Sequence, residues 1–482
     1  MRPEGCGQCK RAKLTCQGYR DTDGLRIRDQ TRSVSQKIIK RVTNTTLSPP
    51  ITVSPKDRAR AAFFSNYVFR GSKSYDFLGP FYTSVDVDKP LSASLEAVSL
   101  AFFAHQENAA RVDKEGRNQY ASALGEVQKA ISCPVAARKD STLLATMLLD
   151  LYEKLTNFNP EFDQAWKSHI KGSLALVEIR GPLLFQDRNG FRMMARLGTN
   201  LLISCVATDT PPPPDLAALR QYESKYLNSK DPKWLLSDLM LIYVSLRENI
   251  SKGQLRDGEI ITSLLSLESE FVNLVVKSPD TWQPQKVRLR SPTERALGDH
   301  IDVFLDYHIT QTRNVSRLVR ILLNEMLRDY ASSPAGVGWA YKEGSSLRTR
   351  AEKTILKLVN DICASVPQYT CPKLTEPCSE SLSSESKRVS AGDASSESRV
   401  GIRMDSPEEK VRAYTLIFPL YIAGQTVGAT EQQKQWIISQ LHFMSSAMAI
   451  KNAEVVAKIL ETGEKMNPWK VYALLGSYAF AA

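Results

Sequence analysis

The feature that most constrains this chain is a helical spacing of apolar side chains, which recurs along most of its 482 residues. Apolar residues three or four positions apart lie on one face of an α-helix. Three such stripes are Trp166, Ile170, Leu174 and Val177; Val315, Leu318, Leu322 and Met326; and Ile437, Leu441, Met444 and Met448. From about residue 92 onward no segment shows the sustained apolar–polar alternation typical of strands. The sequence therefore predicts an all-α body.

Turn-forming residues interrupt this helical pattern at three places. Pro and Gly cluster at 181–190, 210–215 and 332–338. Pro lacks the backbone N–H that a helix interior needs, and Gly readily leaves the helical conformation. We therefore expect helices to end at these clusters.

A Ser-rich segment at about 371–410 differs in composition from the rest of the body. Ser is interspersed there with Glu, Asp and Lys, and apolar side chains are few. Such a segment cannot bury enough apolar surface to stay ordered, so we expect a disordered insertion. The helices before and after it should form one body over 61–482, because the apolar stripe at 437–448 needs a partner surface.

The net charge of +11 is concentrated at the N-terminus. Residues 1–60 hold 14 Lys and Arg against 5 Asp and Glu, whereas the remainder of the chain holds 49 against 47. A basic segment joined to a nearly neutral body is typical of proteins that contact nucleic-acid phosphates. A solvated basic tail or an import signal would show the same charge.

The sequence offers no membrane-spanning segment and no secretory signal. The longest apolar run, TLIFPLYIAG from Thr415, is about half the length that a bilayer helix needs. The first residues carry charges in place of the apolar core of a signal peptide. We therefore expect no membrane partner and a reducing compartment, in which cysteines are thiols or metal ligands.

Three cysteines near the start of the chain have the spacing Cys-x2-Cys-x6-Cys. Cys6 and Cys9 could bind one Zn²⁺ from a tight turn, and Cys16 could return to it after a short helical turn. Three thiolates do not complete a tetrahedral structural site, and none of the other cysteines is an obvious fourth ligand. The spacing alone leaves open whether these cysteines bind zinc.

This segment resembles one half of the DNA-binding module of the fungal binuclear zinc cluster transcription regulators. In that family two halves of similar spacing supply six thiolates to two zinc ions, and the last cysteine of the second half is typically followed by x-Gly-Tyr. Here Cys16 is followed by QGY, so the resemblance is to the second half. The resemblance implies zinc ligands at Cys6, Cys9 and Cys16 and phosphate contacts from Lys10, Arg11 and Lys13.

The family places its base-reading residues in the first half, and Met1 leaves no room for that half before Cys6. We therefore expect this polypeptide to lack the first half or to have lost it from its start. A module of this kind folds when it binds its metal ions. With only half of the ligands present, we expect it to fold poorly. Residues 1–30 are accordingly expected to be a partial zinc cluster of poor order.

Residues 31–60 are predicted to be a basic linker between this segment and the body. Thr, Ser and Pro are frequent in its second half. The family often has a short coiled coil here, but Val34, Ile38 and Val42 cover too few heptads to predict one. A homodimer, or association with other transcription regulators, is left open.

The body is similar to the fungal-specific regulatory domain of the same family. The stretch WKSHIKGSLALVEIRGPLLF at 166–185 resembles a Trp-x2-His-x2-Gly motif that leads to Arg-Gly. Two later landmarks are matched by RNVSRLVRILL at 313–323 and by FPLYIAG at 418–424. These motifs are helix-packing signatures and not catalytic ones.

Two functions are expected from these resemblances. The first is a nuclear, DNA-binding transcription regulator that controls a metabolic or secondary-metabolite gene set. The alternative is a truncated regulator that lacks sequence-specific DNA binding and acts through protein–protein contacts. An enzyme is not expected, because the chain has no nucleophile elbow, phosphate-binding loop, dinucleotide fingerprint or His-Glu-x2-His motif. A helical pocket with converging ionisable groups would favour an enzyme after all.

Three histidines are candidate ligands by residue type alone. His169 lies on an amphipathic segment, where we favour a partly buried, hydrogen-bonded structural role. On a helix, His300 and His308 would lie about 80° apart. We therefore expect no metal site there and interpret the aspartates around them as a solvated acidic face.

Overall fold

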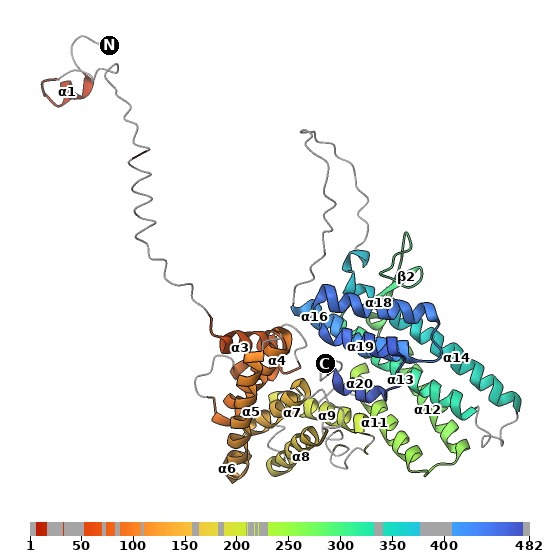
Figure 1. Cartoon of the computed structure of the whole chain (residues 1–482). Coiled ribbons are helices and arrows are strands. Elements are labelled where there is room, and N and C mark those ends of the chain that lie inside the picture. Colours follow the sequence, from red (N-terminus) through yellow and green to blue (C-terminus); the bar gives the residue numbers. More distant parts are fainter. Residues whose placement is uncertain are drawn as a thin grey trace. The chain divides into compact units, whose positions relative to one another are not determined.

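The computed structural model divides the chain into two compact units, Met1–Ser54 and Pro55–Ala482. The structure describes residues 6–16, 32, 53–69, 74–81, 87–107, 110–156, 163–181, 188–208, 210, 216, 220, 230–331, 341–375 and 407–475. In the first unit the described element is α1 (Gly7–Arg11), and the second unit is the helical body (Figure 1).

The first half of the body is built around one buried helix, α7 (Asp140–Thr156). Thirteen of its seventeen residues are buried, so it is covered on all sides. It packs against α4 (Lys89–Glu107), α5 (Ala110–Ile131) and α8 (Asp163–Arg180). The remaining elements of this half are α3 (Pro55–Phe64), the π-helical turn η2 (Ser65–Phe69), the 3₁₀ turn η3 (Asp76–Phe81), α6 (Pro134–Ala137) and α9 (Arg188–Thr208).

The second half of the body is a set of helices around α13 (Tyr307–Ala331) and α14 (Tyr341–Ala364), which pack against each other. Helix α12 (Asp257–Val276) also packs on α13. Helix α11 (Pro232–Ser251) packs against α12 and against α9 of the first half. The smaller elements here are η5 (Asp280–Trp282), α15 (Pro367–Thr370) and η7 (Pro372–Thr375). The last helices are α16 (Pro407–Tyr414), α17 (Ile417–Gln425), α18 (Glu431–Met448), α19 (Lys451–Thr462) and α20 (Pro468–Leu474).

The predicted all-α architecture is confirmed for the described residues. The stripe on α18 is fully buried at all four positions, and Val315 and Leu318 on α13 are buried as well. On α8, Leu174 and Val177 are half-buried against the core, while the side chains of Trp166 and Ile170 lie outside the described part. Helical spacing therefore identified the core-facing sides of these helices.

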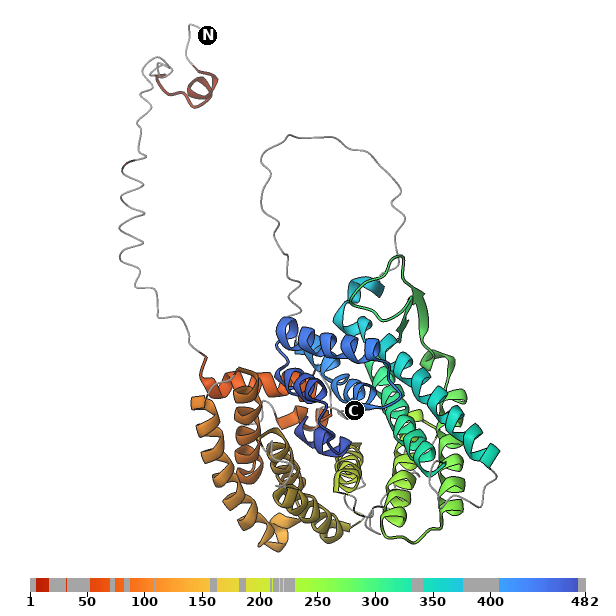
Figure 2. The same cartoon turned by 45° about the vertical axis from the view of Figure 1, so that its right-hand side comes forward.

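The segments before and after the Ser-rich stretch contribute helices to the same body. Helix α17 packs against α13 and α14, and α20 packs against α9 in the other half (Figure 2). Eight of the nine residues of α17 are buried. A single cluster of buried apolar side chains runs from Phe63 to Leu475, so the two halves share one core.

The structure corrects several predicted boundaries. Helix α3 begins at Pro55, so the body starts inside the predicted linker 31–60. Residues 372–375 form η7 and α16 starts at Pro407, so the predicted insertion of 371–410 is too wide. Residues 376–406 and the predicted coiled-coil positions Val34, Ile38 and Val42 lie outside the described residues.

A short β-hairpin replaces the acidic helix expected around His300. Strand β1 (Gln285–Arg288) pairs antiparallel with β2 (His300–Val303), with Arg288 opposite His300. The expectation of a solvated acidic face was wrong for Asp302, which is 3% exposed. Burial of Ile301 and a buried cation beside Asp302 favour the strand, which local spacing could not reveal. Among the described helices, none is both long and apolar enough to cross a membrane.

Candidate metal centre

The cysteine segment folds as one helical turn followed by a reversal of the chain. Cys6 caps α1, and its sulfur accepts a hydrogen bond from the backbone N–H of Cys9, with an N···S distance of 3.4 Å. Helix α1 ends at Arg11, and Lys13 follows with a φ of 55°, in the left-handed region. The N–H of Leu14 then bonds back to the carbonyl of Cys9 at 3.0 Å. This reversal returns the chain toward its start.

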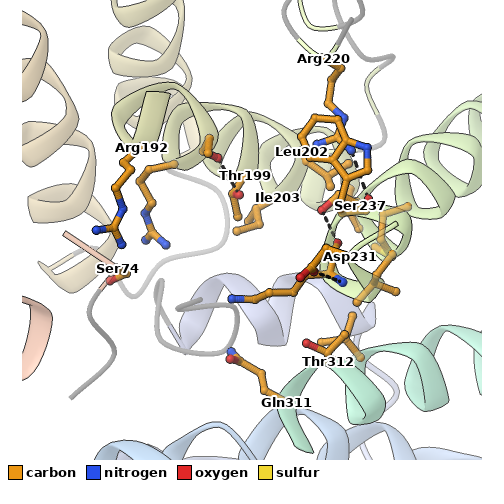
Figure 3. A pocket seen from close by; sticks show the side chains of 18 of the residues that line it. Ser74, Arg192, Thr199, Leu202, Ile203, Arg220, Asp231, Ser237, Gln311 and Thr312 are labelled. Atoms are coloured by element: carbon orange, nitrogen blue, oxygen red, sulfur yellow. Dashed lines mark hydrogen bonds between the residues drawn. The ribbon is translucent and has the colours of Figure 1, made fainter. Parts of the chain in front are cut away.

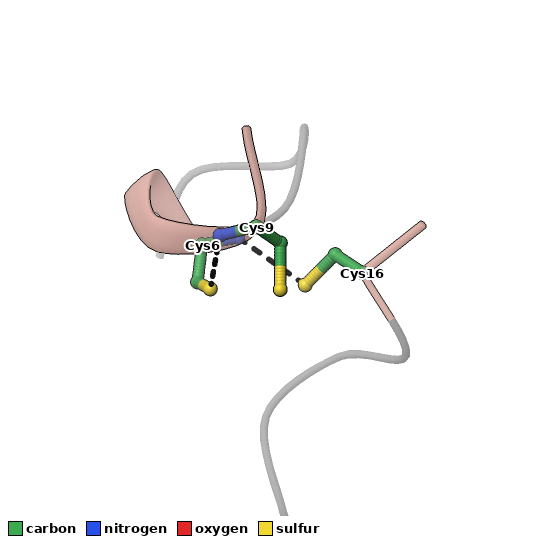
Figure 4. A group of neighbouring side chains, drawn as sticks. All are labelled: Cys6, Cys9 and Cys16. Atoms are coloured by element: carbon green, nitrogen blue, oxygen red, sulfur yellow. Dashed lines mark hydrogen bonds between the residues drawn. The ribbon is translucent and has the colours of Figure 1, made fainter. Parts of the chain in front are cut away.

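The reversal brings the three cysteine sulfurs together. The Sγ atoms of Cys6, Cys9 and Cys16 all lie within 4.8 Å of one another (Figure 4). The backbone N–H of Cys6 also donates to Cys16 Sγ at 3.3 Å. Local hydrogen bonds thus gather the thiols within residues 6–16, and the poor order expected of residues 1–30 stays a prediction. Residues 17–30 lie outside the described part of the chain.

Hydrogen bonds to sulfur set the protonation of the cluster. The pKa of the Cys6 thiol is lowered, chiefly because the Cys9 backbone N–H stabilises its thiolate. The pKa of Cys9 is raised to about 11, first because its thiol donates to Cys6 and then because it donates to Cys16. Hydrogen bonds thus couple the thiols of Cys6 and Cys9, and a cation placed among the three sulfurs would replace thiol protons.

Three converging thiols can hold a metal ion. A tetrahedral zinc site has Zn–S bonds of about 2.3 Å and therefore S···S separations of roughly 3.8 Å. Separations up to 4.8 Å need only a small contraction around an ion. In the part of the chain that the structure describes, no other set of His, Cys, Asp or Glu side chains gathers closely enough to hold one. The site supplies three of the four ligands that structural zinc takes.

The predicted phosphate-contacting residues surround this cluster. Lys10 and Arg11 are in the last turn of α1, Lys13 follows the helix, and all three are exposed. Their charges lie at the C-terminal end of α1, where cations are favoured by the helix dipole. Arg11 Nε also bonds the Gly7 carbonyl at 3.1 Å. Sequence spacing gave the residues of this site, but the left-handed turn at Lys13 had no recognisable signal.

His169 has the structural role that the sequence favoured. It is half-buried on α8, and its Nε2 lies 3.0 Å from the hydroxyl of Tyr120 on α5. Burial lowers its pKa, so the neutral imidazole is the favoured form. His308 lies at the second position of α13 and His300 in β2, so these two histidines are on different elements.

The landmark segment at 313–323 forms a buried polar network on α13. Arg317 Nη2 is 3.3 Å from Asp302 Oδ2 on β2, and Arg317 Nη1 donates to Asn314 Oδ1 at 2.8 Å. Asn314 in turn donates to Ser365 Oγ at 3.0 Å, beyond the end of α14. These residues tie the hairpin and α14 to α13, which agrees with a packing role for the motif.

No protein-family model, curated protein or solved structure matches the chain. What the protein does is therefore inferred from its own residues and geometry.

Proposed function

We propose that this protein is a transcription regulator of the zinc cluster type, in which a metal-stabilised N-terminal segment contacts DNA and the helical body has a regulatory role. The observation that carries the proposal is the convergence of the Cys6, Cys9 and Cys16 sulfurs within 4.8 Å, in the most basic part of the chain. Zinc is the proposed ion because thiolates at this spacing favour it.

The basic residues give this segment its proposed contact with nucleic acid. Lys10, Arg11 and Lys13 are held by α1 and its terminal turn, so a metal that fixes the turn also fixes their positions. Contacts to phosphate position a protein on DNA without reading its sequence. We therefore propose that this chain binds duplex DNA weakly and with little sequence preference, in the nucleus.

Metal analysis tests the first part of this proposal. We expect the purified full chain to bind less zinc than the pair of ions that a complete binuclear cluster holds, because three sulfurs are placed to ligate it. Changing Cys6 and Cys9 to Ser should abolish this zinc. The matched control is Cys133→Ser, since Cys133 is an exposed thiol outside the cluster. Zinc retained by the double variant would contradict a metal site here.

A salt titration tests the DNA contact. Changing Lys10, Arg11 and Lys13 together to Ala should weaken binding to every duplex alike and flatten the slope of log K against log salt by up to about three units. Fluorescence anisotropy measures both effects with a scrambled duplex and with one that contains CGG, the half-site that the resemblance to the zinc cluster family implies. The control is the triple change of Arg348, Arg350 and Lys353 to Ala, which removes the same charge from the exposed side of α14.

The two functional alternatives predict different outcomes. A preference of about a hundredfold for the CGG duplex would show that the chain reads bases, contrary to the proposal of non-specific binding. No salt-dependent binding to either duplex, with zinc present, would favour the regulator that acts through protein contacts alone.

A further inference from the structure

The helical body contains a cavity of about 470 Å³ between its two halves. Its walls come from α9, α11, α13 and α20, with η3 at one edge (Figure 3). This size falls within the range of about 300–1,000 Å³ that small-molecule sites usually occupy. The cavity could therefore hold a small organic molecule.

The lining of the cavity combines an apolar wall with a cluster of cations. Phe77, Met240 and Trp469 belong to the apolar wall, and each is almost fully buried. Arg192 and Arg196 enter from α9 and Lys233 from the start of α11, and Arg220 adds a further cation from the segment before α11 (Figure 3). An occupant that suits this lining has an apolar body and an anionic end.

Arg196 is the most unusual group of the cavity. It is 4% exposed, and none of its three guanidinium nitrogens has a hydrogen-bond partner. Its guanidinium carbon lies 5.0 Å from the centroid of the Tyr75 ring, which is a favourable cation–π contact. Buried cations normally have acceptors, because removing them from water is costly. The guanidinium therefore has N–H donors available to a ligand.

The neighbouring carboxylates are already engaged by other groups. Asp76 pairs with Arg192, and Asp231 Oδ1 accepts the backbone N–H of Lys233 at 2.8 Å at the start of α11. Asp150 Oδ2 accepts bonds of 2.8 Å from Lys154 and from Asn200. The other oxygen of Asp150 accepts no hydrogen bond, so Arg196 does not pair with it.

A second cation, Lys233, faces the same cavity. Burial is the main cause that lowers the pKa of its amine, and the charges of Arg196 and Arg192 lower it further, against the opposing effect of Asp231 and Asp306. An anion placed beside Arg196 would favour the charged form of Lys233. Binding of an anion would thus provide a negative partner for two buried cations, Arg196 and Lys233.

We propose that this cavity binds a small organic carboxylate with an aromatic or other apolar body, its carboxylate seated on Arg196 beside Lys233. The planar guanidinium matches the two oxygens of a carboxylate, and the apolar wall accommodates the rest of the molecule. This inference goes beyond the proposed function and does not depend on zinc or DNA binding.

The cavity is also the converging set of ionisable groups that would favour an enzyme. Its described lining includes Lys and Asp but no His, Cys or Glu side chain. Its two aspartates, Asp76 and Asp231, each already interact with another group. The lining thus supports recognition of an anion more directly than it supports a reaction.

Thermal unfolding of the full chain with matched ligand pairs tests the inference. The probes are benzoate, 3-phenylpropionate and 2-naphthylacetate, each compared with its uncharged amide at about 5 mM, where a ligand that binds only the folded state raises the melting temperature. We expect at least one acid to raise it and its amide to have no effect. In calorimetry, Arg196→Met should weaken binding of that acid at least tenfold.

Two further variants separate binding from folding. Arg196→Lys keeps the charge but loses the planar fork, so it should bind the acid with intermediate affinity. The control is Arg320→Met, because Arg320 is a mostly buried arginine of α13 whose acceptor, Glu268, lies 2.7 Å away and outside this lining. It should lower the melting temperature and leave the affinity unchanged, whereas ligand-free Arg196→Met should melt no lower than the unmodified protein.

Three outcomes would overturn the proposal. The first is that no acid stabilises the protein more than its amide does. The second is that binding of the acid survives Arg196→Met unchanged. The third is that Arg320→Met weakens binding as much as Arg196→Met, which would make the effect one of folding.

Discussion

At the scale of single residues, buried charge in this protein divides into two kinds. Arg317 is buried with acceptors on Asp302 and Asn314, so its burial is compensated within the fold. Arg196 is equally buried but has no acceptor of its own. The Arg317–Asp302 pair is favourable in the folded chain only while both partners are present. Arg196 can instead be compensated by the anionic group of a bound ligand.

Removal of one partner from the Arg317–Asp302 pair should destabilise the protein strongly. Arg317→Met leaves the carboxylate of Asp302 buried without its cation, and we expect a loss of about 3–5 kcal/mol in the free energy of unfolding. Urea unfolding measures this loss. Combining Arg317→Met with Asp302→Leu should recover part of it, because neither charge of this pair then remains buried.

An exposed pair provides the control for this effect. Arg256 and Glu259 form an ion pair of 2.8 Å at the start of α12, on the surface. Arg256→Met should leave the urea midpoint essentially unchanged, since solvent screens such pairs. A similar loss at both sites would show that burial does not govern these ion pairs.

At the scale of elements, close approach of helices depends on small residues in the connections. Gly428 lies between α17 and α18, directly against α14. A Cβ at this position would be 2.7 Å from Cγ2 of Ile355, whose side chain is fully buried. A β-branched side chain has little freedom to move away, so the connection must shift instead.

Gly428→Ala should therefore destabilise the body by about 1–3 kcal/mol through overpacking. The double variant Gly428→Ala, Ile355→Ala should lose less stability than the two single variants lose together, because Ile355→Ala removes the methyl group that clashes. The matched control is Gly125→Ala in the exposed middle of α5, where no atom lies within 4 Å. It should raise stability by about 0.5–1 kcal/mol through helix propensity. Thermal or urea unfolding measures both stabilities. Equal stabilities of Gly428→Ala and Gly125→Ala would contradict the packing argument.

At the scale of the whole molecule, the C-terminal helices complete a core that begins near residue 63. Helix α17 covers α13 and α14, and Trp469 of α20 closes one wall of the cavity. A chain that ends before Pro407 should therefore expose large apolar faces and aggregate. Size-exclusion chromatography and thermal unfolding test this expectation.

An internal deletion is the control for this truncation. Removing residues 380–400 leaves every described helix in the sequence, and we expect the melting temperature to stay nearly unchanged. A truncated chain that remains soluble and unfolds cooperatively would show that the helices before residue 376 form an independent domain.

The two candidate sites differ in how far the sequence could predict them. Cys6, Cys9 and Cys16 are close in sequence, so their spacing predicted a common site, and one turn of helix with a left-handed residue gathers them. The cavity residues come from distant segments, with Arg196 on α9 and Trp469 on α20. In the sequence, nothing distinguishes Arg196 from an exposed arginine, because its burial depends on helices that follow it.

The sequence by itself determined the helical class, the buried faces of α13 and α18, and the residues of the thiol cluster, because periodicity and short spacing act over a few turns of chain. The tertiary structure alone decided which faces meet. It placed Asp302 in a strand beside Arg317, and it enclosed Arg196 without an acceptor at the junction of α9, α11, α13 and α20. Burial and pairing of charge are properties of the assembled core, so a pattern confined to one segment cannot specify them.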